Sequence, residues 1–146
     1  MIPPFDANGR LPPGIHRAEW GEFHQRFASN PHRTRLMEGL KRALDTLRAA
    51  HCQTAYIDGS FVTSKMFPGD FDGCWSVAGV DPQLLDPVLL DFSNARAAQK
   101  AKYYGEFFPA ELPEGISGRV FLEFFQADKD TGEPKGIIAL DLRRLP

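Results

Sequence analysis

Two aspartates separated by one residue, Asp70 and Asp72, carry the clearest chemical signal in the chain. Residues 70–77 alternate between polar and apolar types, as a half-buried strand does, and side chains two positions apart on a strand share a face. Carboxylates held that close repel each other unless a cation lies nearby. Oxygen ligands suit Mg²⁺, which keeps waters and also binds substrate phosphates. The pair therefore predicts a magnesium site, although capping of a turn after Pro68-Gly69 would also explain aspartates here.

A Gly-Ser turn precedes this pair. Gly59 and Ser60 follow a short apolar stretch, and the backbone N–H groups and hydroxyl of such a turn can bind an anion. Lys65 lies five residues later, on the loop or short helix expected to overhang the turn, where it would bind phosphate or remain a solvated charge. A turn that binds phosphate, next to carboxylates that bind metal ions, is the minimal set of groups needed for phosphoryl or nucleotidyl transfer.

The combined pattern resembles the signature of the nucleotidyltransferase superfamily, which includes DNA polymerase beta, aminoglycoside nucleotidyltransferases and the minimal nucleotidyltransferases of toxin–antitoxin pairs. The matching positions are Ile57, Gly59 and Ser60, then a gap of nine residues, then Asp70, Phe71 and Asp72. The sequence departs from the family pattern at Asp58, where an apolar residue is usual, and at Gly73, which begins a segment only partly apolar.

This resemblance implies transfer of a nucleoside monophosphate from a nucleoside triphosphate to a hydroxyl of a protein, an RNA or a small molecule. Two Mg²⁺ ions would be held by Asp70, Asp72 and a third acid, and Gly59 and Ser60 would hold the β- and γ-phosphates. Some similar small bacterial proteins lie beside regulator or toxin–antitoxin genes, so a role in such a system is implied as well.

The third acid is expected on a neighbouring strand. Glu123 is the first choice, because an acid within the apolar segment 119–126 is costly to bury unless it faces a metal or a partner. It would also take the proton of the acceptor hydroxyl. Asp141 is the alternative third acid, and an exposed position on an edge strand is the alternative explanation for Glu123.

A rival hypothesis is a catalytically inactive nucleotidyltransferase fold that serves as a binding or antitoxin module. Asp58 and the absence of an obvious acceptor-binding domain support it. A metal-dependent phosphohydrolase would also use paired aspartates, but it needs more acid or His ligands than this segment supplies. The four His residues have no zinc-ligand spacing.

The remaining sequence predicts an α/β (α+β) fold, in which helices pack on a nucleotidyltransferase-like mixed β-sheet. The Pro- and Gly-rich residues 1–17 are expected to form an arm packed on a single domain, 18–146, anchored by apolar residues such as Ile2, Leu11 and Ile15. The expected elements are helices over 18–29 and 31–50, a strand over 53–57, a short helix or turn over 61–66, a strand over 70–77, a helical region over 81–103, a loop over 105–118, and strands over 119–126 and 136–142 that form a C-terminal hairpin.

Composition limits the environment and the partners. The chain has 146 residues, a formal net charge of −2 and only short apolar runs, so neither a membrane partner nor a long nucleic acid is expected. Without a signal-peptide pattern, and with two cysteines that we expect to be free and buried, a cytoplasmic location is predicted. Because little chain remains to bind an acceptor, a protein partner or a homo-oligomer is expected.

Overall fold

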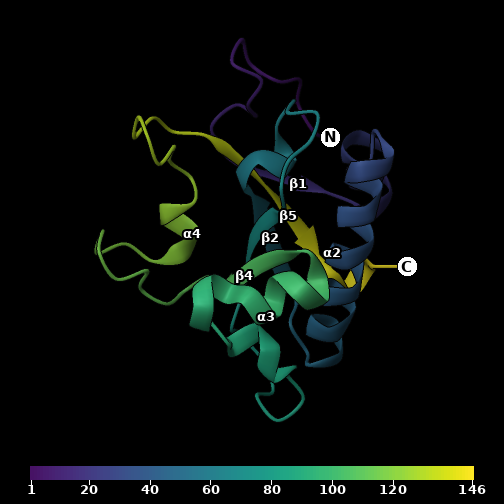
Figure 1. The fold of residues 1–146 in the computed structure, drawn as a ribbon, viewed down its shortest axis with the longest axis vertical. Helices are drawn as coiled ribbons and strands as arrows, with labels where there is room; N and C mark the ends of the chain where they lie inside the picture. Colours follow the sequence, from purple (N-terminus) through teal and green to yellow (C-terminus); the bar gives the residue numbers. More distant parts are fainter.

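A five-stranded mixed sheet lies at the centre of the protein in the computed structural model, which describes residues 1–146 (Figure 1). The strands, in spatial order, are β1 (Gly14–Ala18), β5 (Gly136–Asp141), β2 (Thr54–Asp58), β3 (Phe71–Trp75) and β4 (Gly105–Pro109). β1 is parallel to β5 and β3 is parallel to β4, whereas β2 is antiparallel to both of its neighbours. The predicted α/β (α+β) class with a mixed sheet is confirmed.

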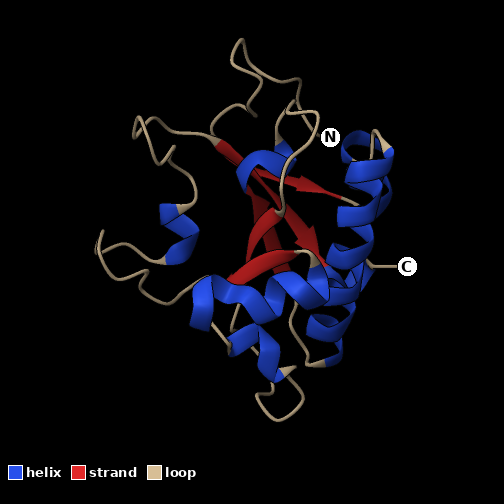
Figure 2. Ribbon diagram, in the orientation of Figure 1, coloured by secondary structure: helices blue, strands red, loops and turns tan.

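Helices cover the sheet unequally (Figure 2). Three of them pack on one face: α1 (Trp20–Phe27), α2 (Pro31–Ala49) and α3 (Ser93–Tyr103). The short helix α4 (Phe121–Phe124) lies on the other side of the sheet from α2 (Figure 1). Three 3₁₀ segments complete the fold: η1 (Gly59–Val62), η2 (Pro87–Leu90) and η3 (Leu142–Arg144). None of the helices combines the length and apolar character needed to cross a bilayer.

The first two helices form where the sequence predicts them. The Asn30 side chain caps α2 by accepting a hydrogen bond of 2.8 Å from the backbone N–H of Arg33, and Pro31 occupies the first turn. Four leucines of α2, spaced three or four residues apart, are all buried: Leu36, Leu40, Leu44 and Leu47. The aromatic stripe of α1 is likewise part of the core, with Phe23 and Phe27 fully buried.

The pleat of the strands separates an apolar face from a polar one. Alternate side chains of β2, including Ala55 and Ile57, point into the core beneath α2. Asp58 has the opposite orientation and is paired with Asp72 of β3, which in turn is paired with Glu106 of β4. The face opposite the helices therefore carries three carboxyl groups from three adjacent strands.

Two expectations for the second half of the chain are wrong. Residues 105–109 form the edge strand β4 rather than part of a loop, with Phe107 buried and Glu106 and Phe108 on the other face. Segment 119–126 contains the helix α4 rather than a strand, because Phe121 and Phe125, one helical turn apart, both pack on Phe108.

The predicted C-terminal hairpin is also wrong. β5 forms as a strand, but it lies between β1 and β2 rather than beside segment 119–126. Helical structure over 81–103 is found only in part, as η2 and α3. The two cysteines are free and buried as predicted.

The N-terminal residues contact the core through the buried side chains of Ile2 and Leu11. The last residues of the arm form the strand β1, which the sequence did not predict, and β1 extends the sheet at one edge. Ile15, expected as an anchor, belongs to that edge strand and is 43% exposed.

We expect Phe108→Ala to release α4 from the sheet. The Phe108 ring stacks on Phe121 at 4.6 Å between centroids and lies 5.7 Å from Phe125, so its loss removes the main aromatic contact of that helix. Unfolding free energy should fall by roughly 2 kcal/mol, and limited proteolysis should cut residues 110–135 faster. Phe67→Ala, at a ring that is 62% exposed, is the control and should change neither; equal protection in both variants would contradict the packing role.

Candidate functional site

The candidate site is the row of carboxyl groups contributed by Asp58, Asp72 and Glu106. Cross-strand pairing places Asp58 opposite Asp72 and Asp72 opposite Glu106, and directly opposed side chains on one face are about 4.5–5.5 Å apart at Cβ. The Glu106 carboxyl is close enough to that of Asp72 to raise the pKa of Asp72.

Burial makes the row reluctant to ionise. Asp58 is 1% exposed, its Oδ2 atom has no hydrogen-bond partner, and burial together with the charge of Asp72 raises its pKa well above the ordinary range. Burial and the neighbouring Glu106 carboxyl raise the pKa of Asp72 to about 8. A cation that binds to Asp58 and Asp72 would therefore have to displace protons.

Cations flank the row on the β4 side. Arg96 of α3 donates from Nε to Oε2 of Glu106 at 2.7 Å, and Nζ of Lys100 lies 3.8 Å from the same oxygen. Arg96 is the last of three consecutive residues with positive φ at the start of α3. Left-handed backbone is unfavourable for non-glycine residues and often marks functional sites. This end of the row thus combines an acid with a cation held on unusual backbone.

Asp70 joins the row from the residue just before β3. Burial raises the pKa of its carboxyl, the charge of Glu106 raises it further, and Lys100 and Arg96 act in the opposite direction. The charge of Asp70 in turn raises the pKa of Asp72. The structure therefore brings the two predicted aspartates together.

Gly59 and Ser60 lie against the row, at the end of β2. Gly59 has a φ of +76°, and a Cβ atom there would lie 2.2 Å from Oδ2 of Asp72, so only glycine allows this close approach. Ser60 follows in η1 and is partly exposed, and its hydroxyl makes no hydrogen bond within the protein. This backbone and hydroxyl are thus next to the carboxyl groups and available to a ligand.

A buried arginine shapes the loop that follows. Arg33 of α2 is 2% exposed and donates to the backbone carbonyls of Phe61, Thr63 and Lys65 at 2.6–3.1 Å, as well as to that of Phe27. These carbonyls belong to η1 and to the loop after it, which has no regular structure of its own. Arg33 therefore fixes the path of the chain immediately after Gly59 and Ser60.

Three residues expected at the site lie elsewhere. Glu123 is exposed on α4, and the carboxyl groups that act on Asp72 are those of Asp70 and Glu106. Asp141 ends β5 opposite Thr54, which is about 13 Å along β2 from Asp58 at 3.3 Å per residue. Hydrogen bonds from Arg143 occupy its carboxylate and lower its pKa.

Lys65 is the third. Its side chain is exposed and makes no ion pair, and its contribution to the loop is the backbone carbonyl that Arg33 binds.

Sequence reasoning missed Glu106 and the role of Asp58. Glu106 stands in the short segment Gly105–Pro109, whose flanking Gly and Pro look like loop residues, although its Glu-Phe-Phe alternation is a weak strand signal. Lys135 immediately precedes β5, and its charge lowers the pKa of both Asp58 and Asp72. Asp58, which departs from the family pattern, is a member of the row.

The donor chemistry of the row fits a hard divalent cation. Every available ligand is a carboxylate oxygen, as Mg²⁺ prefers, and Oδ2 of Asp58 is a buried acceptor without a donor. No three His, Cys, Asp or Glu side chains are arranged as a finished cation site. Binding of a cation therefore requires Asp58 and Asp72 to lose their protons and the carboxyl groups to move.

Comparison with protein families identifies one family that matches most of the chain. The model of a family of unknown function, DUF6932, matches residues 3–141. The chain belongs to the DUF6932 family. Comparisons with curated proteins and with solved structures gave no match. The matched range of this DUF6932 chain includes all five strands and the whole carboxyl row.

In this DUF6932 protein, we expect Arg33→Met to be strongly destabilising. It would leave several buried carbonyls without donors, at roughly 1–3 kcal/mol each. The free energy of unfolding, measured in urea, should fall by about 3 kcal/mol or more. Arg35→Met, at an exposed position two residues along the same helix, should cost no more than about 1 kcal/mol. Similar losses in both variants would show that the carbonyl contacts of Arg33 are not responsible.

Stability without metal should fall as the pH rises. The pKa of Asp72 is about 8 in the folded protein against an ordinary 3.8, so between these values the folded state holds a proton that the unfolded chain has lost. Its contribution is complete below pH 3.8 and disappears as the pH rises through about 8. Tm measured in EDTA should therefore decline from pH 5 to 9, and Asp72→Asn should flatten the decline. Glu38→Gln on exposed α2 surface should leave the wild-type slope, and an unchanged slope in Asp72→Asn would contradict the assignment.

Proposed function

We propose that the protein is a Mg²⁺-dependent nucleotidyltransferase that transfers a nucleoside monophosphate from a nucleoside triphosphate to a hydroxyl group. The observation that carries this proposal is the close approach of Gly59 to the carboxyl of Asp72, which is itself paired across the strands with Glu106. A phosphate-binding turn and a carboxylate group with open oxygen ligands are then adjacent, as the chemistry requires. The acceptor is a protein, an RNA or a small molecule, presented by a partner or a second copy.

Asp70, Asp72 and Glu106 would hold the metal, with Asp58 beneath them as a buried neighbour. Bound Mg²⁺ would offset the charge of the phosphates and of the leaving pyrophosphate. Glu106 takes the place that the sequence assigned to Glu123, since it is on the strand next to β3. The two aspartates keep the role predicted for them.

The reaction would form one bond and break one. The acceptor oxygen attacks the α-phosphorus, the bond from that phosphorus to the bridging oxygen breaks, and pyrophosphate leaves. The proton of the acceptor hydroxyl passes to Glu106. Gly59 and Ser60 hold the β- and γ-phosphates through backbone N–H groups and the free hydroxyl.

One observation favours a second candidate, an inactive binding module of the same fold. The carboxyl row does not form a finished cation site, and burial raises the pKa of both Asp58 and Asp72. A module of this kind would keep the sheet and the Gly59 contact but bind no Mg²⁺. The two candidates differ in a single measurable property, metal-dependent use of a nucleoside triphosphate.

The test is Mg²⁺-dependent labelling with α-³²P nucleoside triphosphates, using each of the four bases, on the protein itself and on added RNA. Asp70→Asn, Asp72→Asn and Glu106→Gln should each lower labelling by at least about 100-fold. Glu123→Gln is the matched control and should retain wild-type activity. Millimolar Mg²⁺ at pH 8 should also raise the Tm of the wild type but not that of Asp72→Asn.

Three outcomes separate the candidates. Loss of labelling in the Asp70, Asp72 and Glu106 variants, with labelling retained in Glu123→Gln, supports the proposal and the assignment of Glu106. Loss of labelling in Glu123→Gln, with labelling retained in Glu106→Gln, would show that the third acid is Glu123 on α4. Neither labelling nor a Mg²⁺-dependent gain in Tm in the wild type would establish the inactive module.

A further inference from the structure

Lys135 lies just beyond the end of the β2–β5 pairing, on the side of the carboxyl row where β2 ends, and makes no ion pair. It is half-buried, its charge lowers the pKa of Asp58 and Asp72, and no carboxylate lies within ion-pair distance of its ammonium group. Its position just before β5 puts it at the β2 side of the row, away from Arg96 and Lys100. The Lys135 ammonium group is therefore a positive charge without an ion-pair partner, next to the proposed phosphate-binding turn at Gly59 and Ser60.

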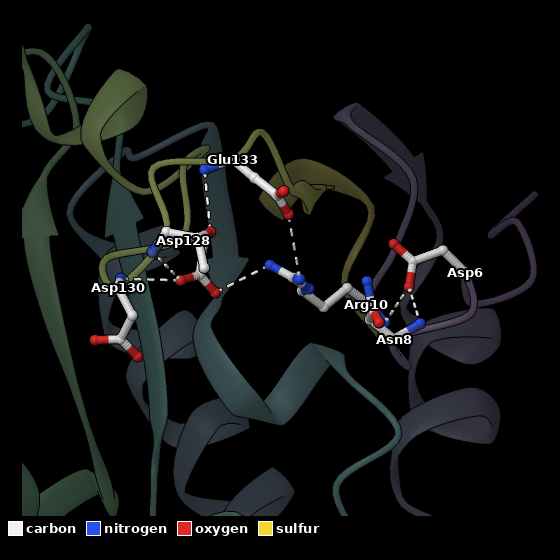
Figure 3. A network of polar contacts seen from close by, with 7 residues as sticks. Asp6, Asn8, Arg10, Asp128, Asp130 and Glu133 are labelled. Atoms are coloured by element: carbon white, nitrogen blue, oxygen red, sulfur yellow. Dashed lines mark hydrogen bonds and ion pairs between the residues drawn. The ribbon is translucent and has the colours of Figure 1, made fainter.

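The loop that leads to Lys135, residues 126–135, is built around Asp128. The Oδ1 atom of Asp128 accepts from the backbone N–H groups of Asp130 and Thr131 at 2.9 and 3.0 Å (Figure 3). Its own N–H donates to the carbonyl of Glu133 at 2.8 Å, and the N–H of Lys135 donates to Gln126 at 2.9 Å. This 126–135 loop is thus a closed turn that ends at Lys135.

A single residue of the N-terminal arm holds the 126–135 loop in place. Nη1 of Arg10 lies 3.0 Å from Oδ2 of Asp128, and Nη2 lies 3.7 Å from Oε2 of Glu133 (Figure 3). The side chains of Arg10 and Asp128 are only 20% and 24% exposed. Such a partly buried pair, shared with a second acid, is more strongly held than an ordinary surface ion pair.

Arg10 is itself fixed by a tight turn. Asp6 accepts at Oδ1 from the N–H groups of Asn8 and Arg10, and the carbonyl of Arg10 accepts from the N–H of Asp6 at 2.7 Å. The carbonyl of Gly9 in this turn accepts from the N–H of Ser64 at 2.9 Å, in the loop after Gly59 and Ser60. The turn over residues 6–10 therefore contacts the loops on both sides of the phosphate-binding turn.

We propose that Arg10 is a positioning residue, which holds the 126–135 loop so that the Lys135 ammonium binds the triphosphate of the nucleotide substrate. The inference rests on the proposed function. Lys135 touches the substrate, and Arg10 acts only through the loop. The ligand chemistry is that of a polyphosphate chain, which an ammonium group binds through charge and hydrogen bonds regardless of the base.

The experiment is a double-mutant cycle on nucleotide binding. Equilibrium dialysis with Mg²⁺ and each of the four labelled nucleoside triphosphates gives Kd for the wild type, Arg10→Met, Lys135→Met and the double variant. Lys135→Met should weaken binding by about tenfold or more, as expected for a lost charge-assisted hydrogen bond. Arg10→Met should weaken it to a similar or smaller extent, and the double variant should bind no worse than Lys135→Met alone.

A conservative variant separates positioning from general stability. Arg10→Lys keeps a cation beside Asp128 and Glu133 and should retain most of the affinity, and it replaces Arg10→Met if that variant does not fold. Arg144→Met removes an exposed ion pair with Glu19 of 2.8 Å and is the matched control, with unchanged Kd. In turnover assays, Arg10→Met should raise KM for the nucleotide more than it lowers kcat.

The outcomes distinguish this inference from the proposed function. Binding by the wild type with full affinity in Arg10→Met, or strictly additive losses in the double variant, would overturn the positioning role and leave the proposed function standing. Failure of the wild type to bind any nucleoside triphosphate with Mg²⁺ would overturn the proposed function and this inference with it.

Discussion

Asp58, Asp72 and Glu106 lie side by side on three adjacent strands, and carboxylates at that spacing repel one another unless protons or cations share the space. The structure accommodates them by burial, which keeps protons on the row, and by cations at its two ends. The register of β2, β3 and β4 brings the acids together, so the fold and its chemistry impose the same requirement. The neighbouring segments either lie against this row or place charged side chains beside it.

Guanidinium groups organise the irregular chain around the row in two different ways. Arg33 is buried and satisfies backbone carbonyls, so it replaces the hydrogen bonds that a helix or strand would have supplied. Arg10 is partly exposed and holds carboxylates, so it joins two segments that are far apart in the sequence. The first arrangement gives the loop after Ser60 a fixed path, and the second ties the N-terminal arm to the 126–135 loop.

Local signals predicted the elements that depend on local spacing, and failed where tertiary contacts decide. The Asn30 cap, the leucine stripe of α2 and the Asp70–Asp72 pair were all recognisable from the sequence. Segment 119–126 alternates like a strand, yet its rings pack as a helical turn on Phe108, and this removes Glu123 from the row. Glu106 escaped notice because an edge strand of five residues between Gly and Pro has almost no periodicity to detect.

The place of β5 in the sheet has a consequence for how the protein is made. Residues 136–141 form the strand between β1 and β2, so β1, near the start of the chain, has no partner until nearly all of the preceding sequence has been synthesised. The order of strands therefore delays completion of the sheet and leaves the edge of β2 open in a nascent chain. Such an edge is a template for wrong pairing until residues 136–141 are added.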